Sequence, residues 1–141
     1  MIRKALKSDI HDVYRLLCIL ENQDLNYPYF CQKYQNALEN QDIYYHVKVV
    51  DEKVVGFISL YIKRYLHHCH DTGEIVELIV DPQMRNLSIG TELISYIEEF
   101  AVDKGLEELE LSTSTYRKKA HHFYEMHGFV RDHYNYTKKF K

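Results

Sequence analysis

The sequence lacks the features that several classes of protein require. Its 141 residues contain no tryptophan, five glycines, two prolines and three cysteines. An odd number of cysteines in unrelated positions predicts no disulfide framework and favours a reducing cytoplasm. No apolar run reaches the ~18 residues of a membrane span, and the N-terminal residues do not form the apolar segment of a secretion signal. The formal net charge is −3 and the basic residues are dispersed, so nucleic acid is not expected as a partner.

The chain does have enough apolar sequence for one packed domain. Apolar residues make up 45% of it, which at this length predicts a single domain over residues 1–141. Alternating and helical apolar spacings follow one another, and this predicts one mixed α/β sheet. The expected strands are residues 2–5, 44–50, 54–62, 74–80, 107–113 and 129–139, the last as one bent strand or two. The expected helices are residues 8–23, 30–40, 91–104 and 117–127.

One strand–loop–helix connection has the composition of an anion site. A strand ends at Val80, Pro82 begins a short turn, and a helix begins near Gly90. The first turn of a helix carries unpaired N–H groups and about half a positive charge, which suits a phosphate. Gly90 would let the backbone approach the anion, and Arg85 could add a charged contact. An ordinary connection in which Gly90 only tightens the turn is the alternative. The P-loop and dinucleotide-binding motifs are absent.

Two signatures of one superfamily occur in the right order. The run Arg85-Asn86-Leu87-Ser88-Ile89-Gly90 resembles the coenzyme A motif of the GCN5-related N-acetyltransferases, Arg/Gln-x-x-Gly-x-Gly/Ala, with Ser88 in place of the first glycine. The stretch Phe123-Tyr124 to Gly128-Phe129 resembles the second signature. The resemblance implies a single domain of this type: a mixed, mostly antiparallel twisted sheet, about four flanking helices and a V-shaped splay between the fourth and fifth strands. It also implies acetyl-CoA as co-substrate, and it is compatible with a homodimer.

A finer resemblance concerns the acceptor. Several short stretches are similar to the aminoalkylphosphonate N-acetyltransferases, and they imply acetyl transfer to a small primary amine of that class. A polyamine, an aminoglycoside or a protein amine is the alternative acceptor, and a non-catalytic acyl-CoA-binding regulatory module is a third hypothesis. The stretches are His67-His68, Gly73–Ile75, Glu77-Leu78, Pro82-Gln83, Glu110–Thr113, His121 and Tyr136–Lys138.

Acetyl transfer to an amine needs a base. An alkylammonium with a pKa near ~10.4 must lose its proton, and a neighbouring carboxylate can take it directly or through water. Glu74 and Glu77 are the candidates. They lie three apart on one expected strand, so we expect them on opposite faces with only one at the site. The resemblance favours Glu77 as the base and leaves Glu74 as a substrate contact; a solvated glutamate is the alternative for each.

The departing thiolate needs a proton donor. Tyr124 matches the superfamily tyrosine in the Phe-Tyr pair, and a phenol with a pKa near ~10 suits an alkyl thiol. A core tyrosine is the alternative. The resemblance further implies that the main chain of Leu78–Val80 binds the acetyl carbonyl and the pantetheine arm. The implied cofactor-binding residues are Leu78, Ile79, Val80, Arg85, Asn86, Leu87, Ser88, Ile89, Gly90, Thr91, Ser112 and Ser114.

The run His67-His68-Cys69-His70 offers metal-ligand side chains. On a strand, neighbouring side chains point to opposite faces, and no second pair of ligands follows at zinc-finger spacing. We therefore expect no metal site. The finer resemblance implies instead that His67 and His68 contact substrate, and a half-exposed strand position is the alternative.

Overall fold

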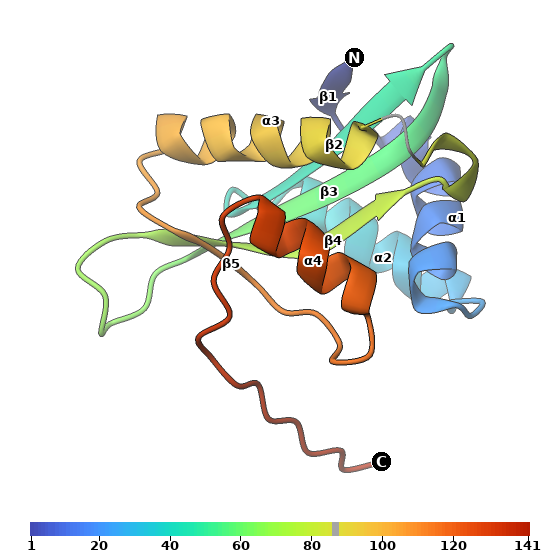
Figure 1. Ribbon diagram of the computed structural model, residues 1–141. Helices are drawn as coiled ribbons and strands as arrows, with labels where there is room; N and C mark the ends of the chain where they lie inside the picture. The colour runs from blue at the N-terminus through green and yellow to red at the C-terminus, as the bar shows by residue number, and fades with distance from the viewer. Residues whose placement is uncertain (86–87) are drawn as a thin grey trace.

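A computed structural model describes residues 1–85 and 88–141 as one mixed five-stranded sheet with helices on both faces (Figure 1). The strand order is β1-β2-β3-β4-β5, and every neighbouring pair is antiparallel except β4 and β5, which are parallel. The elements are β1 (Ile2–Lys4), α1 (Ile10–Glu21), α2 (Tyr27–Leu38), β2 (Ile43–Val50), β3 (Lys53–Lys63), β4 (Thr72–Val80), α3 (Ile89–Asp103), β5 (Leu109–Leu111) and α4 (Lys118–Met126), with 3-10 turns η1 (Lys7–Asp9) and η2 (Pro82–Met84).

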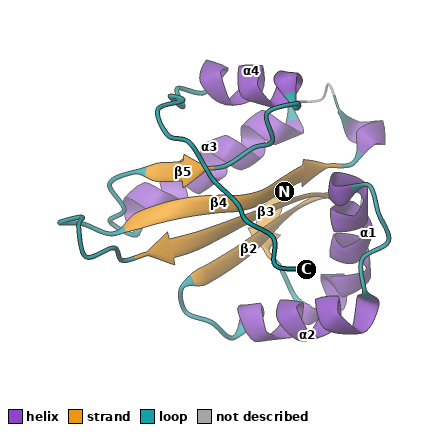
Figure 2. Ribbon diagram, turned by 90° about the horizontal axis from the view of Figure 1, so that it is seen from below, coloured by secondary structure: helices purple, strands orange, loops and turns teal. Residues whose placement is uncertain are grey.

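The sheet is buried on both faces. Helices α1 and α2 cover one face, and α3 and α4 cover the other (Figure 2). Strand β3 serves both layers because its successive side chains alternate: Phe57 belongs to the core beneath α1 and α2, and Ile58 to the core beneath α3. This confirms the mixed α/β sheet with four helices, and it explains why β3 is apolar along almost its whole length.

Helix α2 begins earlier than its sequence pattern indicated. We expected a loop around Pro28 and a helix from residue 30, but α2 starts at Tyr27. The side chain of Asn26 caps it by accepting the Tyr29 N–H at 2.9 Å. Pro28 stands in the first turn, where its missing N–H costs nothing, so this proline starts a helix rather than breaking one.

The prediction of a C-terminal strand over residues 129–139 is wrong. In the described part of the chain, residues 127–141 form neither helix nor strand, and beyond α4 they extend away from the domain (Figure 1). Phe129 still packs on Tyr124, but Val130, Tyr134 and Tyr136 are exposed. Alternating β-branched and aromatic residues favour a strand only when a partner edge is in reach, and the pattern cannot report whether one is.

Strands β4 and β5 part after a short parallel pairing. They pair from Gly73 opposite Leu109 to Ile75 opposite Leu111, whereas β4 continues to Val80 beside β3. Among the described residues, the outer edge of β4 after Ile75 therefore has no strand partner, which confirms the expected splay. Its main-chain groups on that side are available to a ligand.

A substitution of Gly73 tests the close packing where β4 pairs with β5. A Cβ at that position would lie 2.9 Å from Leu60 Cδ1 and 3.0 Å from both Leu106 Cδ1 and Leu109 Cδ2. Because this core has no room for the added methyl group, Gly73→Ala is expected to lower the free energy of unfolding by about 1–3 kcal/mol. Urea denaturation measures the change. Leu109→Ala should reduce that cost in the double mutant, and an unchanged urea midpoint in Gly73→Ala would contradict the packing.

Candidate active site

Ser59 is the one polar residue among the buried residues of β3, and it forms hydrogen bonds with Glu77 of β4. Ser59 is fully buried; its hydroxyl donates to the Glu77 carboxylate and accepts the Glu77 N–H at 2.9 Å. Sequence reasoning missed Ser59. The signal was there, because it is a single serine inside the apolar run Val54–Ile62.

A bulge in β4 changes which way the two glutamates point. Ile58 pairs with Leu78 but Leu60 pairs with Ile75, so two residues of β4 lie opposite Ser59. The extra residue reverses the alternation, and Glu74, opposite Tyr61, shares the face of Glu77. The expectation of opposite faces was therefore wrong, since a three-residue spacing gives opposite faces only in a regular strand.

The surroundings of Glu77 favour its protonated form. Burial raises the pKa of the Glu77 carboxyl, the hydrogen bond from Ser59 opposes that rise, and the charges of Glu21 and Glu74 add to it. Two tyrosines lie on the same face: their hydroxyls are 3.5 Å apart, and burial raises the pKa of both Tyr45 and Tyr61, with the charge of Glu77 adding to each rise. Glu77 is thus a partly buried carboxyl group with a raised pKa, and this makes it a candidate general base.

Basic groups border this acidic face. The Lys63 ammonium lies 3.5 Å from a Glu74 carboxylate oxygen and 5.6 Å from the centre of the Tyr61 ring. The charge of Lys33 on α2 lowers the pKa of Tyr61, against the larger effect of burial. A ligand on this face would meet carboxylates and ammonium groups together.

The residues predicted to form an anion cradle lie at the start of α3 and just before it. Ser88 adopts the left-handed conformation, with φ 61° and ψ 19°, and its side chain does not cap the helix. The first helical bond runs from the Glu92 N–H to the Ser88 carbonyl at 3.0 Å. The amides of residues 89–91 precede this bond and lie in the first turn, which is where a helix can bind an anion. Arg85 is exposed just before the cradle, and Asn86 and Leu87 lie outside the described residues.

Gly90 has a packing reason that the sequence did not reveal. A Cβ there would approach the Phe123 ring of α4 to 3.3 Å. The glycine therefore lets α3 and α4 pack closely, whether or not an anion is bound.

An ion pair with a buried carboxylate fixes the turn that leads from β4 to the start of α3. Asp81 is 4% exposed, accepts the Gln83 N–H at 3.0 Å and pairs with Arg15 of α1 at 3.0 Å. The backbone hydrogen bond from Gln83, followed by the Arg15 contact, holds the pKa of the Asp81 carboxyl below its usual value, against the opposing effect of burial. Arg15 also donates to the Val54 carbonyl at 3.3 Å. The turn is thereby tied to α1 and β3.

Tyr124 lies on the other side of the sheet from Glu77. It packs against the core beneath α3 and α4, with Phe123 and Phe129 rings 5.4 and 5.9 Å away. Burial raises the pKa of its phenol, and the charge of Arg117 opposes that rise. Arg117 also donates to the Leu20 carbonyl at 3.1 Å, which joins the start of α4 to the end of α1. The phenol therefore stays protonated near neutral pH and can act as a donor.

The remaining expected site residues fall into two groups. Ser112 and Ser114 are exposed just beyond β5, and the Ser114 carbonyl lies 2.8 Å from His121 Nε2.

His67 and His68 lie on the β3–β4 loop, residues 64–71, and not on a strand as expected. His68 lies 3.9 Å from Glu108, at the end of β4 away from the cradle, so the structure does not bring it to Glu77.

Comparisons with known proteins agree with this geometry. The model of the Acetyltransferase (GNAT) family matches residues 8–129. An aminoalkylphosphonate N-acetyltransferase of Salmonella typhimurium is 38% identical over 137 residues, which are 97% of this chain and 89% of that protein. The human N-alpha-acetyltransferase 30 is 30% identical over 93% of this chain and 35% of its own.

The similarity extends to solved structures. A crystal structure from Bacillus halodurans, described as a transcriptional regulator, has a TM-score of 0.91 over 99% of both chains at 21% identity, which shows the fold alone. Within residues 1–85 and 88–141, no helix is long and apolar enough to cross a membrane.

Ser88 provides the test of the cradle. A left-handed conformation costs a residue with a Cβ about 1–2 kcal/mol, and glycine avoids most of that cost but loses more entropy on folding. We therefore expect Ser88→Gly to raise the free energy of unfolding by about 0.5–1 kcal/mol in urea denaturation. Ser88→Ala keeps the Cβ and serves as the control. Equal stability changes in the two variants would contradict the left-handed geometry.

Proposed function

Because this chain belongs to the GNAT acetyltransferase family and is an N-acetyltransferase, we propose that it moves the acetyl group of acetyl-CoA directly to the amine of an aminoalkylphosphonate. The observation that carries the proposal is Glu77, a partly buried carboxylate with a raised pKa, held by Ser59 beside the open edge of β4. Its position on one face of the sheet, with Tyr124 on the other, suits two reactants that enter from opposite sides.

The residues present fit acetyl-CoA. The first-turn amides of residues 89–91 would bind its pyrophosphate, and Arg85 would add a charge-assisted contact. The unpaired edge of β4 at Leu78–Val80 would hold the pantetheine arm and the acetyl carbonyl by main-chain hydrogen bonds. Ser112 and Ser114, just beyond β5, would line the other side of the splay.

In the proposed reaction, Glu77 on one face of the sheet acts first and Tyr124 on the other face acts last. Glu77 takes a proton from the ammonium group, directly or through water, because its pKa is raised toward that of a useful base. The free amine attacks the thioester carbon, and the main chain of β4 stabilises the charge that develops on the carbonyl oxygen. The carbon–sulfur bond then breaks, and Tyr124 donates its phenolic proton to the departing thiolate. The nitrogen loses its second proton as the amide forms, and that proton restores the phenol of Tyr124 through solvent.

The charges around Glu77 support a zwitterionic acceptor. Glu21, Glu74 and Glu77 would attract the ammonium group, while Lys33 and Lys63 would attract the phosphonate. A polyamine or an aminoglycoside carries no anionic group for the two lysines. This balance and the similarity to the Salmonella protein favour an aminoalkylphosphonate over those amines and over a protein N-terminus.

An amine panel with saturating acetyl-CoA and a thiol-reactive dye tests the proposal. We expect kcat/KM for 2-aminoethylphosphonate to exceed that for n-propylamine by about 10-fold or more, since one charged contact is worth about 1.5 kcal/mol. Spermidine, an aminoglycoside and an N-terminal peptide complete the panel. Equal or better rates with any of these would overturn the acceptor class. Bound acetyl-CoA without thiol release for any amine would overturn catalysis.

Tyr124→Phe removes the proposed proton donor and little else. We expect kcat to fall about 10²-fold or more while the affinity for acetyl-CoA is nearly unchanged. Steady-state kinetics and calorimetric titration measure the two quantities. Tyr134→Phe, in the exposed C-terminal segment, is the matched control and should keep full activity. A fully active Tyr124→Phe would remove this residue from the mechanism.

Glu77→Gln keeps the shape of the side chain and removes its charge. We expect kcat/KM to fall and its pH profile to shift to higher pH, because only amine that is already deprotonated in solution can react. An unshifted profile would indicate a different base. Glu74→Gln, on the same face, is the control for loss of a carboxylate.

The same substitution has an expected effect on stability. A carboxyl with a raised folded-state pKa contributes stability below its unfolded pKa and loses it as the pH rises through the folded value. The free energy of unfolding of Glu77→Gln minus that of the wild type should therefore be larger at pH 7 than at pH 4. Urea denaturation at the two pH values measures the difference, and the opposite trend would contradict the burial of this charge.

A cytoplasmic location and a homodimer stay predictions. The exposed aromatic residues beyond α4 are compatible with the homodimer.

A further inference from the structure

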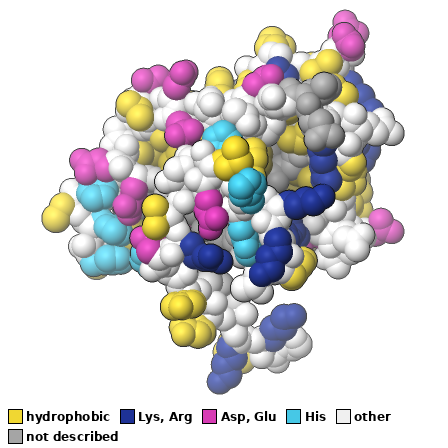
Figure 3. Space-filling view, viewed as in Figure 1, with side chains coloured by type: hydrophobic (Ala, Val, Ile, Leu, Met, Phe, Trp, Pro, Cys, Tyr) yellow, Lys and Arg dark blue, Asp and Glu magenta, His cyan; other side chains and the backbone are white. Residues whose placement is uncertain are grey.

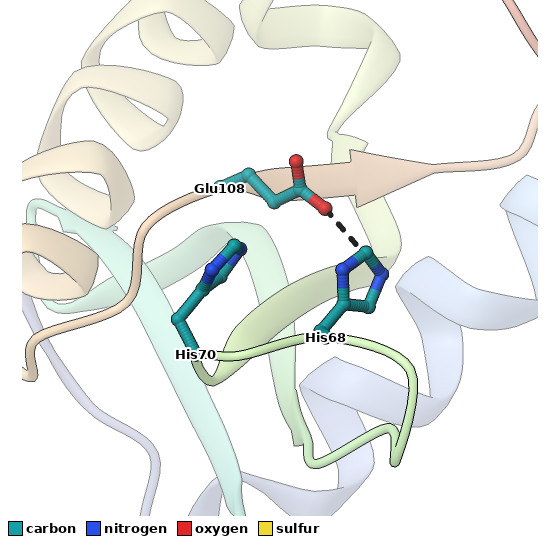
Figure 4. A group of neighbouring side chains, drawn as sticks. All are labelled: His68, His70 and Glu108. Carbon is teal, nitrogen blue, oxygen red and sulfur yellow. Dashed lines mark ion pairs between the residues drawn. The ribbon is translucent and has the colours of Figure 1, made fainter.

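A cluster of potential metal ligands lies outside the proposed active site. His68 and His70 come from the β3–β4 loop, and Glu108 immediately precedes β5 (Figure 4). One ligand atom from each lies within 4.8 Å of the others. Figure 3 shows histidine side chains gathered beside acidic ones on the side of the molecule where this loop lies.

The donors are the types that zinc and similar metals prefer. Two imidazole nitrogens and one carboxylate oxygen form a three-ligand set, and metal–ligand bonds of 2.0–2.2 Å place tetrahedral donors roughly 3.3 Å apart. His68 Nε2 is already 3.9 Å from Glu108 Oε1. The side chains of His68 and Glu108 are 29% and 50% exposed, so rotation about their side-chain bonds can close the remaining distance.

A second carboxylate orients one of the imidazoles. His70 Nδ1 lies 3.1 Å from Glu107 Oε2, which leaves Nε2 as the nitrogen that can bind a metal. A histidine ligand usually makes such a contact with its other ring nitrogen, because the contact fixes the tautomer and increases the basicity of the ligand.

The backbone brings the two ligand segments together without a metal. The Gly73 N–H donates to the Glu108 carbonyl at 3.0 Å, and the Glu107 N–H donates to the Asp71 carbonyl at 3.2 Å. On the loop, the Tyr65 and His67 rings pack on the His68 ring, with centroids 5.7 and 4.4 Å away. The Tyr65 hydroxyl donates to Glu110 at 3.2 Å. Binding a metal therefore requires little ordering of the chain.

We propose that His68, His70 and Glu108 bind one divalent metal ion of the zinc type, which fastens the β3–β4 loop to the start of β5. The loop precedes β4 and the cradle follows it, so the ion sits at the far end of this strand from the cradle and takes no step in acetyl transfer. Three protein ligands leave a fourth position for water or an anionic group. The site is independent of the proposed acceptor.

Titration of the metal-free chain with Co²⁺ alone, and then with Zn²⁺, tests the site. We expect one Co²⁺ per chain with the visible absorption of a nitrogen–oxygen site, and displacement by Zn²⁺ with micromolar or tighter affinity. His70→Ala and Glu108→Gln should each weaken binding more than 10-fold, and loss of the orienting carboxylate in Glu107→Gln should weaken it about 10- to 100-fold. Circular dichroism checks that each variant is folded.

His67→Ala is the matched control, because it removes an exposed histidine of the same loop that is outside the ligand set. Because it removes a ring that packs on His68 but no ligand, it should weaken Co²⁺ binding far less than His70→Ala does. Zinc should also slow tryptic cleavage after Arg64 in the wild type but not in His70→Ala. No saturable binding by the wild type, or equal loss in His67→Ala and His70→Ala, would overturn the site.

Discussion

Beyond Ile75, strand β4 keeps β3 as a partner on one edge and has no strand partner on the other. Buried main-chain groups must find hydrogen-bond partners, so an unpaired edge inside a domain is a place for a ligand. The rest of the site is arranged around this edge. The proposed cradle lies where β4 leads into α3, Tyr124 lies on one face of the sheet, and Glu77 lies on the other.

The bulge in β4 gives this edge its chemistry. It brings Glu74 and Glu77 to one face and sets the second beside Ser59, whose hydroxyl satisfies both the carboxylate and the main-chain N–H. A partly buried carboxylate is costly unless it is hydrogen-bonded, and one serine limits that cost without cancelling the effect of burial. The result is a carboxyl group with a raised pKa, which is what abstraction of a proton from an ammonium group requires.

Contacts distant in sequence hold the surrounding helices in place. Arg15 joins α1 to the turn after β4 through Asp81, and Arg117 joins α4 to the end of α1. Gly90 lets α4 approach α3 closely enough for Phe123 to pack at the start of that helix. At the opposite end of β4, backbone hydrogen bonds from Gly73 and Glu107 hold the β3–β4 loop near β5, where the histidines and Glu108 meet.

The sequence by itself determined the mixed sheet, the order of its five strands and four helices, and the family, and it predicted the cradle. These depend on apolar periodicity and on short motifs, which are local properties of the chain. Ser88 stands where the motif has a glycine, and the structure gives it the left-handed conformation that glycine adopts readily.

Only the tertiary structure decided how distant residues meet. The bulge depends on the register between β3 and β4, so spacing alone placed Glu74 on the wrong face. The C-terminal segment had the pattern of a strand but no strand partner in the described chain. The histidine loop looked unsuited to a metal because its third ligand, Glu108, comes from another element. Register, partner edges and convergence of distant side chains are set by packing of the whole chain, and no local pattern contains them.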